Sequence, residues 1–229
     1  MKRAATKCWG VFTRRERWGL SWRGRAIILL AGLFIVWVIV RDAHAFLAVT
    51  ARVPAKILVV EGWVHDYGVD AALKEFNDGH YSQIYATGGP VEGIGPSSSI
   101  YDTEARRTAL LLVKRGLPAE SVQCVPAVYV GRDRTFTSAL ALHHWFHDRS
   151  MHVGSINVLT EDAHARRTWL LFQEAMGPDT KVGIISAANP DYDASHWWRT
   201  SEGVREVIDE SIAYVYGKFF FWPSAAERK

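Results

Sequence analysis

Residues 156–177, INVLTEDAHARRTWLLFQEAMG, decide the fold because an apolar run leads directly into a helical pattern. The four residues INVL at the start are typical of a buried strand. From Asp162 to Met176 the apolar residues recur at helical spacing, and Gly177 is a typical helix end. The stretch therefore predicts a strand followed closely by a helix, which is the repeating unit of an α/β fold.

The start of this predicted helix carries three basic side chains, His164, Arg166 and Arg167. Carboxylates are favoured at that position, because the helix macrodipole makes the N-terminus partly positive. A bound anion would resolve the conflict, since free N–H groups and cationic side chains would converge on it. The alternative is that the arginines pair with nearby carboxylates, for which the candidates are Glu161, Asp162 and Glu174.

Strand and helix patterns alternate along the chain from Ala55 onward. We expect five strands, at residues 56–61, 83–87, 121–125, 155–159 and 181–186. We expect five helices, at residues 66–78, 102–115, 134–147, 162–176 and 201–217, with Asp102 as the N-cap of the second. The strands are almost continuously apolar, which indicates a parallel sheet covered on both faces. The predicted fold is a three-layer α/β/α sandwich with a mostly parallel, Rossmann-like sheet, in a domain spanning residues 50–218.

The N-terminal segment has the composition of a membrane anchor. An uncharged apolar run extends from Ala26 to Val40, and the leader, residues 1–25, holds eight Lys and Arg against Glu16 alone. The basic flank predicts a cytoplasmic leader, a transmembrane anchor and linker at residues 26–49, and an exported domain. The motif Ala43-His44-Ala45 leaves open a second interpretation, a cleavable signal peptide.

Aromatic residues near the C-terminus also allow two interpretations. Trp197-Trp198 precede the last predicted helix, and the tail, residues 219–229, begins with Phe219-Phe220-Phe221-Trp222 and ends in charged residues. These rings either pack the last helix on the sheet or contact the bilayer surface, where aromatic side chains with a polar edge are favoured.

The charge distribution and cysteine content exclude several classes of function. The 204 residues after the leader hold 19 basic and 23 acidic side chains, so the domain is mildly acidic and no nucleic-acid partner is expected. Cys8 lies in the leader and Cys124 in a predicted strand, which predicts neither a disulfide nor a cysteine-based metal motif. His143, His144 and His147 lack an acidic partner at standard ligand spacing, so we expect no metal and no cofactor.

Polar residues gather where the predicted strands end. In an open parallel sheet, ligands bind at the carboxyl edge where the strand order reverses. The candidate ligand-binding residues are Thr87, Gly88, Gly89, Arg134, Thr135, Thr137 and Arg167. The candidate acid–base residues are Glu61, Glu104 and His164. We expect the glycines to present N–H groups to an anion, and the hydroxyls beside Arg134 to suit an oxyanion at a helix start.

Each of these candidates has a simpler structural interpretation. The glycines are compatible with a plain turn, and the threonines with ordinary helix capping. Glu104 suits the positive end of a helix without any ligand. Glu61 ends an apolar strand, where an unpaired carboxylate is costly, so we expect it to pair with a cation or to bind a ligand.

Five segments together resemble the ElyC/SanA/YdcF family of bacterial envelope proteins. They are ILVVEGW at 57–63, Thr87-Gly88-Gly89, Asp102-Thr103-Glu104-Ala105, Arg134-Thr135-Phe136-Thr137-Ser138-Ala139, and Leu159-Thr160 followed by His164-Ala165-Arg166-Arg167. The resemblance implies a Rossmann-like domain, commonly anchored in the bacterial inner membrane, with a role in cell-envelope and peptidoglycan precursor homeostasis. It implies Gly88, Gly89, Glu104, Thr135, His164 and Arg167 as site residues.

The expected function is that of a membrane-anchored envelope protein whose exported domain binds a phosphate-bearing small molecule or a lipid-linked precursor. If the protein is an enzyme, His164 with Glu61 or Glu104 would perform acid–base chemistry on a phosphoester, as in a hydrolase or transferase. The alternatives are a non-catalytic sensor or assembly factor for peptidoglycan or surface-polysaccharide machinery, and a domain that binds a nucleotide or S-adenosylmethionine.

Overall fold

The computed structural model describes residues 20–91, 102–127 and 133–223 of the chain, which divides into two compact units, Met1–Val40 and Arg41–Lys229. Helix α1 (Trp22–Leu47) has 26 residues and contains a window with a mean hydropathy of 2.3. A helix of this length extends for about 39 Å, which exceeds the ~30 Å of a bilayer core. Within the described residues it is the one helix long and apolar enough to cross a membrane.

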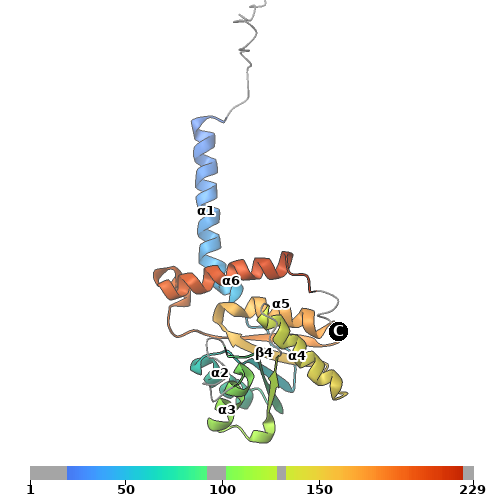
Figure 1. Cartoon of the computed structure of the whole chain (residues 1–229). Helices are drawn as coiled ribbons and strands as arrows, with labels where there is room; N and C mark the ends of the chain where they lie inside the picture. The colour runs from blue at the N-terminus through green and yellow to red at the C-terminus, as the bar shows by residue number, and fades with distance from the viewer. Residues whose placement is uncertain (1–19, 92–101, 128–132, 224–229) are drawn as a thin grey trace, which may run out of the picture. The chain divides into compact units, whose positions relative to one another are not determined.

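The second unit is built on a five-stranded, all-parallel sheet, shown in Figure 1. The strands are β1 (Ile57–Glu61), β2 (Gln83–Gly88), β3 (Val122–Pro126), β4 (Ser155–Glu161) and β5 (Lys181–Ala187). Their order in the sheet is β3-β2-β1-β4-β5, so the direction of strand succession reverses between β1 and β4. The predicted parallel α/β fold is confirmed, and its topological switch point lies at the ends of β1 and β4.

Helices cover both faces of this sheet, as Figure 1 shows. The helices α2 (Asp66–Asp78) and α3 (Glu104–Lys114) pack on one face. The helices α4 (Arg134–Asp148) and α5 (Ala165–Met176) pack on the other. The last helix, α6 (Ser201–Phe219), packs against α5, and three short 3₁₀ segments complete the described elements: η1 (Ala119–Ser121), η2 (Asp162–His164) and η3 (Ala194–Arg199).

The side-chain alternation along β1 explains the three layers. Leu58 and Val60 belong to the apolar cluster with α2 and α3, whereas Val59 belongs to the cluster with α4 and α5. All three side chains are fully buried. Because both faces of the strand are covered, apolar residues occupy every position and the strand has the continuous pattern of a buried parallel strand.

The start of α3 differs from the prediction. The helix begins at Glu104, and its N-cap is Thr103, whose side-chain oxygen accepts a hydrogen bond from the Arg106 N–H at 3.2 Å. Asp102 lies one residue too early to cap the helix, and its carboxylate instead pairs with the Arg106 guanidinium at 2.9 Å. The predicted N-cap at Asp102 is therefore wrong by one residue.

Strand β4 is also longer than predicted. β4 continues to Glu161, because its pairing with β5 extends to Ala187, and α5 begins only at Ala165. Arg166 and Arg167 lie in the first turn of α5, as predicted, but His164 lies in the 3₁₀ turn that precedes it. The bend occurs at Asp162, whose φ of 36° is in the left-handed region that non-glycine residues rarely adopt.

Candidate functional site

A pocket of about 470 Å³ opens at the carboxyl edge of the sheet, beside the switch point. The predicted site residues that line it are Glu61, Gly88, Gly89, Glu104, Arg134, Thr135, Thr137, His164 and Arg167. Thr87 does not line it, because its side chain is fully buried and lies 3.5 Å from the Val60 carbonyl oxygen. Segments far apart in the sequence thus meet in one cavity, as the parallel topology predicts.

The glycines at the strand ends allow close packing of α3. A Cβ on Gly62 would lie 2.5 Å from the Glu104 carbonyl carbon, and one on Gly88 would lie 2.9 Å from the Glu104 Cβ. The carbonyl of Gly89 accepts the Glu104 N–H at 2.8 Å, and that of Gly88 accepts the Ala127 N–H at 2.9 Å. Gly62 and Gly88 therefore have a packing role, which fixes the position of Glu104 on the pocket wall.

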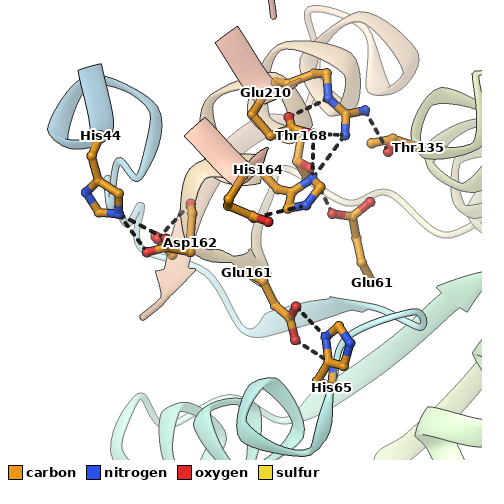
Figure 2. Close-up of polar contacts among 12 residues, drawn as sticks. His44, Glu61, His65, Thr135, Glu161, Asp162, His164, Thr168 and Glu210 are labelled. Atoms are coloured by element: carbon orange, nitrogen blue, oxygen red, sulfur yellow. Dashed lines mark hydrogen bonds and ion pairs between the residues drawn. The ribbon is translucent and has the colours of Figure 1, made fainter. Parts of the chain in front are cut away.

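The cations at the start of α5 are neutralised by α6. Arg167 forms a two-pronged ion pair with Glu210, with its Nε and Nη2 atoms at 2.7 and 2.9 Å from the two carboxylate oxygens. His164 lies between two carboxylates, with Nδ1 at 2.8 Å from Glu210 and Nε2 at 3.2 Å from Glu206. Figure 2 shows His164 and Glu210 facing each other above Glu61. We refer to His164, Arg167, Glu206 and Glu210 as the ionic quartet.

The alternative interpretation, in which the arginines pair with carboxylates, holds for Arg167 but with a different carboxylate from those it named. Arg167 pairs with Glu210 rather than with Glu161, Asp162 or Glu174. The Arg166 guanidinium lies over the Phe46 ring at 4.0 Å and donates to the Phe46 carbonyl. The carboxylates Glu161 and Asp162 pair instead with His65 and His44, as Figure 2 shows.

The ionic quartet shifts the pKa values of its members. Burial lowers the pKa of His164, but the hydrogen bond and charge of Glu210, with the charge of Glu206, outweigh burial and raise it. Burial raises the pKa of Glu210, but hydrogen bonds from His164 and Arg167 outweigh burial and lower it to about 2. Burial, chiefly, raises the pKa of Glu206. When His164 is charged, both of its ring nitrogens are donors. The Arg167 Nη2 and His164 Nδ1 atoms lie 3.1 Å apart, and each then donates to Glu210 instead of to the other.

Glu61 lies on the pocket floor. Its carboxylate is 1% exposed and accepts a hydrogen bond from the Thr168 hydroxyl at 2.8 Å. The Glu61 charge also helps to raise the pKa of Arg167, so the two groups lie within electrostatic range. We expected Glu61 to pair with a cation or to bind a ligand. Among the described residues it accepts a hydrogen bond from a hydroxyl and lies near the Arg167 cation without forming an ion pair with it.

The start of α4 forms the opposite wall. Arg134 is exposed, and the neighbouring Thr135 hydroxyl accepts a hydrogen bond from Arg167 at 3.3 Å. The Thr137 hydroxyl donates to the Asp133 carbonyl at 3.2 Å, and Asp133 has a left-handed φ of 52° and makes no side-chain cap. Arg132, part of the predicted motif, lies outside the described residues. A non-glycine residue in this backbone region is costly and is typical of functional sites.

Sequence reasoning missed the α6 side of the pocket. Glu206 and Glu210 lie one helical turn apart, and Glu210 shares a helix face with the buried Val207. A carboxylate on the buried face of a helix requires a cation, and this requirement is the sequence signal that would have identified Glu210. Trp63 was also missed, and its ring lies 4.5 Å from the His164 ring, centroid to centroid. Ser138, the third hydroxyl expected beside Arg134, also lines the pocket. The remaining lining residues that were missed are Pro90, Ala127, Asp133, Leu171, Ala213, Tyr216, Gly217 and Phe221.

Within residues 20–91, 102–127 and 133–223, no group of three or more His, Cys, Asp or Glu side chains is arranged to hold a metal ion. Cys124 is a half-buried free thiol. Comparison of the chain with protein-family models, with curated proteins and with solved structures found no match.

Proposed function

We propose that this protein is a bacterial cell-envelope protein of the ElyC/SanA/YdcF type, anchored in the plasma membrane by α1 with its N-terminus in the cytoplasm. Its exported domain binds a phosphate-bearing ligand, of which a lipid-linked precursor for peptidoglycan or surface polysaccharide is the leading candidate. The observation that carries the proposal is the single pocket that collects nine predicted site residues at the carboxyl edge of the sheet. Ligands of parallel α/β folds bind at that edge.

The phosphate position is assigned to the start of α4. The first N–H groups of a helix have no acceptor within the helix and favour an anion. Arg134 adds an exposed guanidinium to that end, inside the pocket lining. Arg167 is the weaker candidate, because its guanidinium already binds both oxygens of Glu210.

The pocket also suits a ligand with an apolar part. Besides its polar groups, the pocket is lined by the apolar side chains Trp63, Leu171, Tyr216 and Phe221. A small soluble anion would leave that apolar surface in contact with water. A phosphate attached to a hydrocarbon chain would contact both the polar and the apolar lining.

If the bound phosphoester is cleaved, two groups are positioned for acid–base chemistry. The raised pKa of His164 favours the protonated form of the imidazole, which suits a general acid that protonates a leaving oxygen. Glu61 is an acceptor on the pocket floor and suits the activation of a water or hydroxyl. The reaction class would be phosphoester hydrolysis or transfer.

One observation favours the non-catalytic alternative, a sensor or assembly factor. The ionic quartet is satisfied internally, so His164 and Arg167 have a structural role without a ligand. In a sensor, Glu61→Gln and His164→Gln would leave the cellular function intact as long as the ligand still binds. In an enzyme, either change would abolish turnover of the bound ligand.

A retained anchor, rather than a cleaved signal peptide, is supported by the contacts of His44. Its Nε2 atom lies 3.0 and 2.9 Å from the two oxygens of the buried Asp162 carboxylate, and Leu47 is 1% exposed. Cleavage after Ala45 would remove His44 and leave Asp162 with the Tyr192 hydroxyl as its remaining side-chain partner. Mass spectrometry of the mature protein tests this, since a chain beginning at Phe46 would contradict retention.

The test of ligand binding uses the full-length chain in lipid nanodiscs. Inorganic phosphate and farnesyl phosphate are titrated while thermal unfolding is followed, because a ligand at 100 times its Kd stabilises the folded state by about 2.7 kcal/mol. We expect Arg134→Gln to weaken binding of both compounds. Arg149→Gln is the matched control, because Arg149 lies at the other end of α4, about 22 Å away along the helix. Equal binding by both variants would contradict the proposal.

A further inference from the structure

Helix α6 exposes an apolar stripe, most of which lies outside the pocket. Its members are Ile208, Ile212, Val215, Tyr216 and Phe219. At 100° per residue these side chains fall within an arc of about 100° on the helix surface. Ile212 and Phe219 are each 64% exposed. We refer to these five residues as the α6 stripe.

The opposite face of the same helix is the one packed on the domain. Gly203, Val207 and Glu210 are buried there, and Tyr214, on the same side, packs edge-on against Phe46 at 5.4 Å between ring centroids. The α6 stripe therefore remains uncovered after the helix has completed its packing. A contiguous exposed apolar surface of this kind marks an interaction site.

The chain itself supplies the reason to assign a bilayer to this surface. The apolar run of α1 ends at Val40, and Phe46, which contacts α6, follows only six residues later. Six residues span about 9 Å as a helix and at most about 20 Å when extended. Whatever the relative orientation of the two units, α6 is held within a short distance of the surface from which the anchor emerges.

The chemistry of the helix end fits the same partner. Phe220 and Trp222 follow the α6 stripe directly and are 66% and 82% exposed. Aromatic rings of this type are favoured at the membrane–water interface. Arg205 falls within the arc of the α6 stripe, where its aliphatic stem can lie along apolar surface while the guanidinium reaches lipid phosphates.

Tyr216 connects this surface to the pocket. It belongs to the α6 stripe and also lines the pocket, together with Ala213, Gly217 and the nearby Phe221. The Tyr216 and Phe221 rings lie 6.4 Å apart, centroid to centroid. A ligand with its head group in the pocket could therefore leave its hydrocarbon chain along α6.

We propose that the α6 stripe lies on the lipid bilayer and that the pocket takes its ligand, an amphiphile with a phosphate head group and a hydrocarbon tail, from that bilayer. The proposal rests on the proposed function, in which α1 anchors the chain and the pocket binds phosphate. It adds the route of entry and the requirement for an apolar tail.

The first test measures contact between lipid and the α6 stripe in the full-length protein. Cys8 and Cys124 are replaced by Ser, and a bimane fluorophore is attached to Ile212→Cys or Phe219→Cys in nanodiscs that contain doxyl-labelled lipid. Lys218→Cys is the matched control, because Lys218 is exposed on the same helical turn but outside the arc of the stripe. We expect quenching at positions 212 and 219 to exceed that at 218 severalfold. Equal quenching at all three positions would overturn the proposal.

A parallel measurement distinguishes the bilayer from a second copy of the chain. A nitroxide at Ile212→Cys in nanodiscs loaded with two copies would show dipolar broadening if the stripes of two copies met. Broadening together with the absence of lipid quenching would overturn the proposal in favour of a dimer interface. Lipid quenching without broadening would support it.

The second test separates the route of entry from the pocket. In the double variant Ile212→Gln/Phe219→Gln we expect affinity for farnesyl phosphate in nanodiscs to fall at least tenfold, while affinity for inorganic phosphate is unchanged. Unchanged affinity for both compounds would overturn the proposed entry route and leave the pocket function intact. If Arg134→Gln has no effect on either compound, the proposed function fails, whatever the stripe variants show.

Discussion

The starts of α4 and α5 both carry an arginine that lines the pocket, but the two arginines differ in burial. At α5, Arg167 is largely buried and is held by both oxygens of Glu210. At α4, Arg134 is exposed on the pocket wall. The fold fixes the Arg167 guanidinium on Glu210, whereas the exposed Arg134 side chain is accessible to a ligand in the pocket. Changes at α5 should therefore alter stability, and changes at α4 should alter binding.

The largest effect is expected from Glu210→Gln. This change leaves the buried Arg167 and His164 without their shared carboxylate, and breaking a buried ion pair on one side typically costs about 3–5 kcal/mol. Urea unfolding of the full-length protein in detergent micelles measures the loss. Glu202→Gln, on an exposed position of the same helix, is the control. A loss below about 1 kcal/mol for Glu210→Gln would show that the quartet does not hold α6 in place.

The pH dependence of stability tests the same quartet. Glu210 has its pKa lowered from 4.5 to about 2, so its contribution is complete above about pH 4.5 and is lost as the pH falls towards about 2. The raised pKa of His164 gives a contribution that is complete below about pH 6.5 and is lost as the pH rises through the folded-state value.

The raised pKa of Glu206 lowers the stability of the folded state above about pH 4.5, because the folded state disfavours the charged form of this carboxyl group. The quartet as a whole should therefore be most stabilising near pH 4.5. Its contribution should fall as the pH rises, first through Glu206 and then, above about pH 6.5, through His164, and each unit of pKa difference corresponds to about 1.4 kcal/mol. The measurement is the free energy of unfolding between pH 3 and 9 for the wild type and Glu210→Gln. Parallel curves for the two proteins would exclude the quartet as the source of the pH dependence.

A smaller effect is expected from Thr168→Val in the first turn of α5. The substitution keeps the side-chain shape but removes the hydroxyl that donates to the buried Glu61 carboxylate at 2.8 Å. Leaving a buried acceptor without its donor costs about 1–3 kcal/mol. Thermal unfolding of the variant and of the wild type at neutral pH measures the loss. An unchanged free energy of unfolding would show that the hydroxyl does not stabilise the Glu61 carboxylate.

The smallest effect on stability is expected from Arg134→Gln at the start of α4. Arg134 is exposed, and substitutions at exposed positions usually change the free energy of unfolding by less than about 0.5 kcal/mol. Arg167→Gln in the same experiment should be far more destabilising. If Arg134→Gln destabilises the protein as much as Arg167→Gln does, the contrast between the two helix starts is wrong.

Several elements of the fold follow from local sequence patterns. The helix at Asp66–Asp78 was predicted with its observed bounds, because apolar residues at helical spacing lead to Gly79. The β4–α5 boundary was predicted less well. The strand runs on to Glu161 because β5 offers hydrogen-bond partners as far as Ala187, and that pairing is not visible in the local pattern.

The candidate site also contains some residues that could be predicted from the sequence and some that could not. Its residues on the strand ends and helix starts could be predicted, because parallel topology brings the carboxyl ends of all strands to one edge. The partners of His164 and Arg167 could not, because Glu206 and Glu210 lie more than forty residues further along the chain on a helix whose docking depends on tertiary packing.

Local sequence patterns suffice to predict the parallel α/β architecture, an apolar N-terminal helix long enough to cross a membrane, and the edge at which the polar residues collect, because hydrophobic periodicity and chain connectivity are local properties. The partners of Arg167 and His164 depend on tertiary packing. Electrostatic pairing depends on distances of a few ångströms between side chains, and the packing of α6 against α5 brings Glu210 to Arg167 while Arg134 remains on the open wall.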